Sequence, residues 1–309
     1  MLFGYTLRRL LMLIPVSLSI SVIIFAIVHM LPGDPIDNLM PVGSTHADRV
    51  KMVMKYGFDK PLITQYFLWV SHVARGDFGN AIVMRRPVAS LIADNLPYSL
   101  SLGALAFAFS SIVGMALGLI SVALENVWLE RIVRGFILLG STVPGFFLAL
   151  MMILLFAVKL RWFPVSGADG WRSLVLPVLT IGFGGVALVA RVTRVALMDA
   201  QRMDFVTLLH AKGVSGPNIL LRHLFAHALL PVVTILALRV GWILGGAVTA
   251  EFVFGRPGLG SLLIRSLGQR DYPVVQGCLL MLALAVMLGT LIGDVAQAAM
   301  DPRIREEAS

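Results

Sequence analysis

The sequence has little charge and almost no cysteine. Asp, Glu, Lys and Arg make up 14% of its 309 residues, whereas hydrophobic residues make up 58%. A water-soluble protein of this length needs a larger polar surface, so a lipid bilayer is the expected surrounding. Cys278 is the single cysteine, which excludes an intrachain disulfide and a cysteine-based metal site.

The sequence also lacks the short motifs of common catalytic sites. No Gly-x-x-x-x-Gly-Lys-Ser/Thr is present, and no glycine is followed by lysine, so the chain has no loop to cradle ATP phosphates. His-Glu-x-x-His and Gly-x-Ser-x-Gly are absent as well. We therefore expect no catalytic residues, no bound cofactor and no metal ion in this chain.

The net charge of +8 raises the question of nucleic-acid binding. The basic residues are scattered between apolar runs and do not gather with aromatic residues on one face. Loops that lie beside anionic lipid account for such a distribution. We expect no nucleic-acid partner.

Five long uncharged runs, and a sixth run interrupted by Arg239 and Glu251, predict an all-α integral membrane protein with six transmembrane helices. The first run follows Arg8 and Arg9, is too long for a cleaved signal peptide, and has no small-x-small cleavage site after it. We expect it to remain as the first span. The predicted spans are residues 10–33, 98–124, 135–158, 173–190, about 228–254, and 272–293.

Six spans place both termini on one side of the membrane. If that side is cytoplasmic, the short inner segments carry more Lys and Arg than the short outer segments, as the positive-inside rule requires. Counting residues 33–97 would remove the bias, but a segment of that length has little weight in the rule. We therefore expect cytoplasmic termini.

The residues between the first two spans predict a small helical segment on the outer face. Apolar spacing predicts helices over His46–Tyr56 and Leu62–Val73, with Ser44 or Thr45 as the N-cap and Gly57 as the stop. A disordered loop is the alternative, which the aromatic content disfavours. We expect two parts: residues 1–97 with the first span and this segment, and residues 98–309 with a five-helix core.

The turn that leaves the first span is expected at Pro32-Gly33-Asp34-Pro35. Within the core, Pro144 and Pro177 are expected to kink their spans. The glycine pairs Gly114/Gly118, Gly241/Gly245 and Gly289/Gly293 indicate close helix crossings.

The longest polar stretch on the inner side covers residues 191–227. It predicts two short helices joined at Gly213, which permits a sharp turn, and Pro231 is expected in the first turn of the next span. Such an elbow, lying parallel to the membrane, is a lever that a partner protein can grip. An interfacial helix without a partner fits the residues equally well.

This stretch resembles the cytoplasmic coupling loop of ABC importer permeases, in the dipeptide, oligopeptide, glutathione and nickel branch of that family. The matching segments are Asp204-Phe205-Val206, Ala211-Lys212-Gly213 and Leu229-Leu230-Pro231. The resemblance continues in order along the chain at residues 31–35, 76–79, 86–88, 254–260, 270–276 and 301–305.

The resemblance implies a type I importer fold and a B-type permease subunit in a bacterial cytoplasmic membrane. It implies a second, homologous permease, two ATPase subunits that bind ATP and Mg, and an extracytoplasmic substrate-binding protein. The cargo would be a peptide, glutathione, a nickel chelate or an opine-like solute. A secondary transporter is the rival class, but internal repeats and several buried acids are missing from the sequence.

By the same resemblance, residues 199–228 form the coupling loop to the ATPase. The implied contact residues are Asp204, Phe205, Thr207, Leu209, His210, Ala211, Lys212 and Gly213. Leu209 stands where the family usually has a small residue, and His210 where it often has Arg. We expect Leu209 to face either the ATPase or the membrane.

Two charged residues, Arg239 and Glu251, fall inside the predicted spans, and Asp294 directly follows the last one. Arg239 lies about ten residues into its span, roughly 15 Å from the inner boundary. We favour its pairing with Asp294 or with an acid of the partner permease; the alternative is contact with a substrate carboxylate in the pathway. Glu251 is either an outer gate or docking point for the binding protein, or a solvated acid at the interface.

Overall fold

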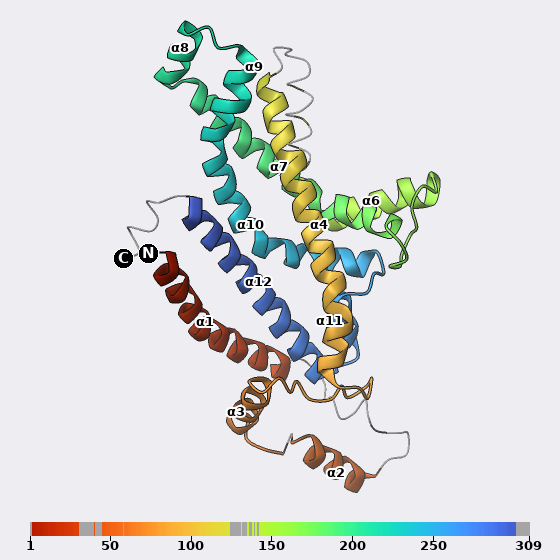
Figure 1. Cartoon of the computed structure of the whole chain (residues 1–309). Helices are drawn as coiled ribbons and strands as arrows, with labels where there is room; N and C mark the ends of the chain where they lie inside the picture. The colour runs from red at the N-terminus through yellow and green to blue at the C-terminus, as the bar shows by residue number, and fades with distance from the viewer. Residues whose placement is uncertain are drawn as a thin grey trace. The chain divides into compact units, whose positions relative to one another are not determined.

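The computed structural model describes residues 2–30, 40, 45–57, 59–123, 131, 135, 138, 140 and 142–300. Their secondary structure is helical throughout, and Asn80 and Pro87 form an isolated bridge (Figure 1). The α-helices are α1 Leu2–Met30, α2 His46–Tyr56, α3 Leu62–Val73, α4 Val88–Ala123, α6 Gly145–Met152, α7 Arg172–Gln201, α8 Asp204–Ala211, α9 Gly216–Asn218, α10 Phe225–Val253, α11 Leu259–Gly268 and α12 Tyr272–Met300. Two π-helical segments are η2, Ile153–Lys159, and η3, Ile219–Leu224.

Five helices are long and apolar enough to cross a membrane, at Gly4–Met30, Val88–Ala123, Arg172–Gln201, Gly216–Gly241 and Tyr272–Met300. Each overlaps one of the predicted spans. A shorter apolar helix, Gly145–Lys159, overlaps the later part of the predicted span 135–158, whose earlier part is only partly among the described residues. The expectation of an all-α membrane protein is confirmed.

One helix boundary differs from the one expected, and one helix was not expected. Pro231 lies inside α10, which begins at Phe225 and is preceded without a break by η3, so Pro231 does not open this span. Helix α11 was not predicted, because its ten residues are too few for a membrane span. It is amphipathic, and it buries Leu259, Leu262 and Ser266.

The chain forms two compact units. The first unit comprises Met1–Leu10, Leu100–Arg256 and Val286–Ser309, and the second unit comprises Leu11–Ser99 and Pro257–Ala285. The predicted turn at residues 32–35 and the motif at 301–305 lie outside the described residues.

In the second unit, helices α2 and α3 have the predicted bounds. Thr45 is the N-cap of α2: its hydroxyl accepts the Asp48 N–H at 3.3 Å, while the Asp48 carboxylate accepts the Thr45 N–H at 3.1 Å. The hydrogen bond from the Thr45 hydroxyl lowers the pKa of the Asp48 carboxyl. Gly57 ends α2 at a φ of 73°. The expected helical segment is therefore confirmed, and its caps are the reason for its length.

Helix α3 packs on the C-terminal half of α1. The Tyr66 and Ser21 hydroxyl groups lie 3.0 Å apart, and the Phe25 ring meets Tyr66 edge-on with ring centroids 5.5 Å apart. Ile24 and Val28 of α1 are buried in a cluster with Tyr272 and Val275 of α12. These contacts fix α3 against two longer helices.

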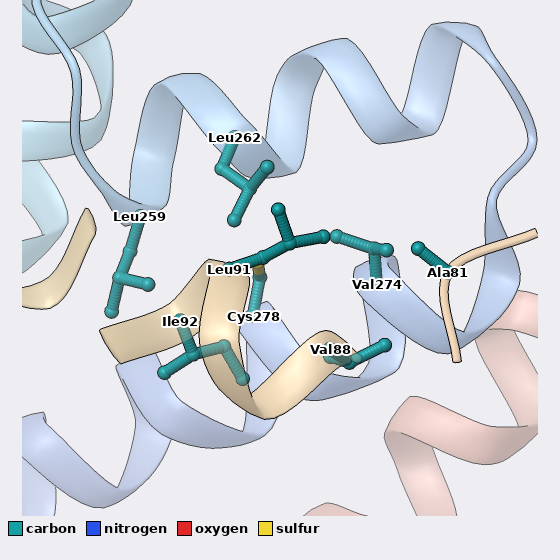
Figure 2. Close-up of a cluster of buried hydrophobic side chains, with 8 residues drawn as sticks. All are labelled: Ala81, Val88, Leu91, Ile92, Leu259, Leu262, Val274 and Cys278. Atoms are coloured by element: carbon teal, nitrogen blue, oxygen red, sulfur yellow. The ribbon is translucent and has the colours of Figure 1, made fainter. Parts of the chain in front are cut away.

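A second cluster joins the start of α4 to α11 and α12. Its buried members are Ala81, Val88, Leu91, Ile92, Leu259, Leu262, Val274 and Cys278, whose side chains converge in Figure 2. Polar contacts brace the same region: the buried Asp271 carboxylate accepts the Ile82 N–H at 3.0 Å and the Val83 N–H at 2.8 Å. The sequence motifs at 76–79, 86–88 and 270–276 thus meet in one folded region.

In the first unit, the glycine pairs mark close helix crossings, as predicted. A methyl group built on Gly114 would lie 2.6 Å from Val189 Cβ of α7, and one on Gly289 would lie 3.0 Å from a methyl of Val240 in α10. Gly241 is close to Thr290 of α12, whereas Gly245 has open space in front of it. Only glycine permits these backbones to approach so closely.

Candidate functional site

The predicted elbow is a short helix closed by a glycine turn. Helix α8 ends in a Schellman motif: the Gly213 N–H donates to the His210 carbonyl at 2.9 Å, and the Val214 N–H donates to the Leu209 carbonyl at 3.1 Å. Gly213 has a φ of 75°, which disfavours any residue with a side chain. Asp204 occupies the first turn, where its negative charge complements the helix dipole.

A buried cluster attaches α8 to the ends of the long helices. Val206 of α8 packs with Leu197 and Ala200 of α7, Ile219 and Leu224 of η3, and Ala228 of α10. Leu119 and Val122 of α4 pack against the same cluster. Figure 1 shows α8 and α9 together at one end of α7 and α10. A force on α8 is therefore transmitted to α4, α7 and α10 through packed side chains.

The predicted contact residues divide between two faces of α8. Asp204, Thr207, His210, Ala211, Lys212 and Gly213 are exposed. Phe205 and Leu209 are half-buried and pack on the cluster just described, and the Phe205 ring also lies 4.7 Å from the His227 ring. Leu209 thus packs partly inward, and its contact with an ATPase or the membrane stays a prediction.

Two exposed apolar residues of this region were missed from the sequence. Met203 precedes α8, and Leu208 lies on its outer face with 55% of its surface exposed. The helical spacing could have predicted the exposure of Leu208, because this residue lies about 100° round the helix from the inward-facing Leu209. The exposed surface of this region is therefore partly apolar.

A hollow of about 730 Å³ opens beside the elbow, between the end of α4 and helices α8, α9 and η3. His210 lines it, and its Nδ1 lies 2.9 Å from the Val206 carbonyl. The hollow could receive a side chain of a partner protein. The π-helical turn η3 forms one of its walls and runs directly into α10.

Arg239 lies in the first unit beside a glycine of the neighbouring helix. A methyl group built on Gly185 would overlap the Arg239 guanidinium, with Nη2 only 2.6 Å away, and would lie 2.7 Å from Ser110 Cβ. The absent side chain at Gly185 thus provides the space for the guanidinium. Among the described residues, Arg239 has no carboxylate within ion-pair distance.

The expected ion pair between Arg239 and Asp294 is wrong. The Asp294 carboxylate instead pairs with Arg9, at 2.9 Å between Oδ2 and Nη1. The Arg9 guanidinium also lies over the Tyr5 ring, 5.3 Å from its centroid. Asp294 thus ties the end of α12 to the start of α1.

A cavity of about 550 Å³ has Arg239 in its wall. The remaining wall comes from α6, α7 and α10, with Phe146, Thr180, Phe183 and Thr249 among the lining residues. Gly184, Gly245 and Gly246 also line the cavity and contribute no side chains to it. One cation in a largely apolar cavity is suited to an anionic group of a solute.

Glu251 is fully buried near the end of α10, so the interpretation as a solvated interfacial acid is wrong. Arg256, also buried, follows it by five residues, and the Arg256 N–H donates to the Glu251 carbonyl at 2.8 Å. The Arg256 guanidinium reaches Ser173 Oγ at 3.4 Å. Glu251 is therefore part of the packed end of α10.

Solved structures of ABC transporters share this fold. A chain of the MetNI methionine ABC transporter in an inward-facing conformation aligns with a TM-score of 0.57 and 20% identity, over 68% of this chain and 96% of that one. A chain of an amino acid ABC transporter crystallised with histidines aligns with a TM-score of 0.52 and 16% identity, over 69% and 94%. These likenesses show that the chain has the same fold as those two chains.

The chain belongs to the family of inner membrane components of binding-protein-dependent transport systems, whose model matches residues 86–306. A model of the N-terminal part of such components matches residues 2–103. The chain is thus a multi-pass permease subunit of an ABC importer, a class that works with ATPase and substrate-binding partners.

Similar proteins include the glutathione transport system permease protein GsiC of Escherichia coli strain K12. It is 39% identical over 305 residues, which cover 98% of this chain and 99% of that protein. GsiC of Shigella dysenteriae serotype 1 gives the same values.

Proposed function

We propose that this permease imports short peptides or peptide-like solutes such as glutathione, and that α8 couples it to separate ATPase subunits. ATP and Mg would be bound and hydrolysed by those subunits. A second, homologous permease completes the pathway, and an extracytoplasmic binding protein delivers the solute. The termini and the 199–228 loop face the cytoplasm.

The observation that carries this proposal is the construction of α8. Its outer face exposes Asp204, Thr207 and Leu208, while its inner face is packed on the ends of α4, α7 and α10. The Schellman motif at Gly213 holds the helix in a fixed orientation. A surface that is exposed outwardly and rigidly attached inwardly is suited to transmit motion from a partner.

The solute class is supported by chemistry and by relatives. The cavity beside Arg239 offers one cation to a carboxylate, a group that every free peptide carries. Proteins 39% identical to this chain are glutathione permeases. In this proposal Arg239 faces the pathway and attracts the anionic end of the solute.

The proposal is tested by placing a charge on the outer face of α8. Leu208→Glu should preserve assembly, because Leu208 is exposed, and should abolish both uptake and solute-stimulated ATP hydrolysis. Val195→Glu is a matched control: Val195 is 52% exposed and lies on α7 outside the elbow. Complexes reconstituted in vesicles with the binding protein allow both activities to be measured. Full coupling in Leu208→Glu would refute the assignment of α8.

A further inference from the structure

The second unit contains a cavity of about 350 Å³ whose wall has both apolar and polar side chains and none of the candidate-site residues. It lies between the outer end of α1, helices α2 and α3, the Gly76–Gly79 loop and the start of α12. Its volume falls at the lower end of the range for small-molecule sites, about 300–1,000 Å³.

Gln276 lines this cavity and is 6% exposed. Its side-chain amide has no hydrogen-bond partner among the residues that the structure describes. An amide that lines a cavity and makes no hydrogen bond within the protein is available to pair with a polar group that enters the cavity. An amide both donates and accepts, as does the peptide group of a bound peptide.

The neighbouring polar side chains are held in place by the protein. His29 Nε2 lies 3.3 Å from Gln65 Oε1, and Gln65 Nε2 donates to the Lys60 carbonyl at 2.7 Å. The Asp77 carboxylate accepts the Gly79 N–H through Oδ1 at 2.9 Å, which leaves Oδ2 for another donor. Preorganised groups of this kind are typical of a binding site.

The cavity also offers both charges and aromatic surface. Asp77 supplies a carboxylate and Lys60 an ammonium group, and both residues are exposed where they line the cavity. The Trp69 ring lies 6.1 Å from the Phe25 ring, centroid to centroid, and both line the same wall. An acid, a base and an amide together match a zwitterion that contains a peptide bond.

We propose that this cavity is a second solute site, which binds a short peptide with free termini. Gln276 pairs with the peptide group, Asp77 with the terminal ammonium and Lys60 with the terminal carboxylate. The choice of a peptide as the solute rests on the proposed function, whereas the existence of a polar site rests on Gln276 and its surroundings.

Binding is tested by equilibrium dialysis of radiolabelled L-alanyl-L-alanine against the purified transporter complex, without nucleotide or binding protein. Gln276→Leu should weaken binding about tenfold, the effect expected for one lost hydrogen bond in a buried site. It should leave the melting temperature unchanged or raise it, because no hydrogen bond within the protein is lost. Unchanged binding in Gln276→Leu would overturn the proposal.

Gln297→Leu is the matched control on the same helix. The Gln297 amide donates to the Thr234 hydroxyl at 3.2 Å and does not line the cavity. This variant should lower the melting temperature and leave binding unchanged. A fall in melting temperature in Gln276→Leu as large as that in Gln297→Leu would assign Gln276 a structural role and overturn the site.

Two further measurements separate the remaining outcomes. N-acetyl-alanine methylamide, which lacks both charged termini, should bind about tenfold more weakly or worse. Peptide binding that occurs only with the binding protein present would make the cavity a docking surface and overturn the proposal. Uptake of the dipeptide is measured in parallel. Normal uptake without binding in dialysis would refute the second site and leave the proposed function standing. Absent uptake would refute the proposed function.

Discussion

Arg9 and Asp294 form an ion pair, 2.9 Å between Nη1 and Oδ2, that joins the two ends of the described chain. The Asp294 side chain is 16% exposed and the Arg9 side chain 45% exposed. The acid is therefore the more sheltered partner, and it depends on the arginine for its charge compensation. Arg239, which does not pair with Asp294, lines the cavity between α6, α7 and α10.

We expect Arg9→Ala to destabilise the permease by about 1–3 kcal/mol, between the values for exposed and for buried pairs. The double variant Arg9→Ala with Asp294→Asn should recover most of the loss, since no charge is then stranded. Arg239→Ala combined with Asp294→Asn should show additive effects. Thermal unfolding in detergent measures all three, and strong coupling between Arg239 and Asp294 would contradict the pairing seen here.

Gly185→Ala should lower stability by about 1–3 kcal/mol, because the new methyl group overlaps the Arg239 guanidinium and Ser110. Gly184→Ala is the matched control, since a methyl group there meets its nearest neighbour, the Gly140 carbonyl oxygen, at 3.4 Å. Purified yield and melting temperature are the measurements. Equal behaviour of the two variants would show that Arg239 does not occupy the space above Gly185.

Gly213→Pro should insert in the membrane yet abolish uptake and solute-stimulated ATP hydrolysis. Proline fixes φ near −65° and removes the N–H that donates to the His210 carbonyl, so α8 loses its closing turn. Gly216→Ala should remain active, because nothing lies within 4 Å of a methyl group there. Vesicle uptake assays compare the two, and normal transport by Gly213→Pro would exclude a coupling role for this turn.

The orientation can be read from single cysteines in a Cys278→Ala background. Asp59→Cys and Asp169→Cys should react with an impermeant thiol reagent added outside intact cells, and Ser215→Cys should not. All three positions are exposed, so accessibility within the protein does not limit the reaction. The reverse pattern would invert the topology expected from the basic residues of the short loops.

Features coded by neighbouring residues could be predicted from the sequence. Helix α2 was found because its cap, Thr45 with Asp48, and its stop, Gly57, lie within the segment itself. Five of the membrane spans followed from uncharged length alone, and the span of α10 was predicted although Arg239 and Glu251 interrupt it. The glycine pairs predicted close crossings, but only the structure identified α7 as the partner of Gly114 and α10 as the partner of Gly289.

Features that depend on distant contacts could not be predicted. The partner of Asp294 could be Arg9 or Arg239 on grounds of charge, and only the fold decides between them. On α8 the inward face is fixed by the packing of Val206 on α7 and η3, which made Leu209 an inward residue and Leu208 an outward one. Helix α11 is too short to be recognised by length, and its burial depends on α4 and α12.

The π-helical turn η3 affects how many residues can separate α8 from α10. The Phe225 N–H donates to the Leu220 carbonyl five residues back, so this turn holds one residue more than an α-helix would. The wide turn completes a full rotation with the extra residue in it, so deleting one residue here would let the turn close as an α-helix and leave the direction of α8 nearly unchanged. The π-helical turn thus accommodates one residue between α8 and α10 without turning the outer face of α8. A residue inserted into a regular part of α10 would instead rotate everything before it by about 100°, while every contact residue stayed the same.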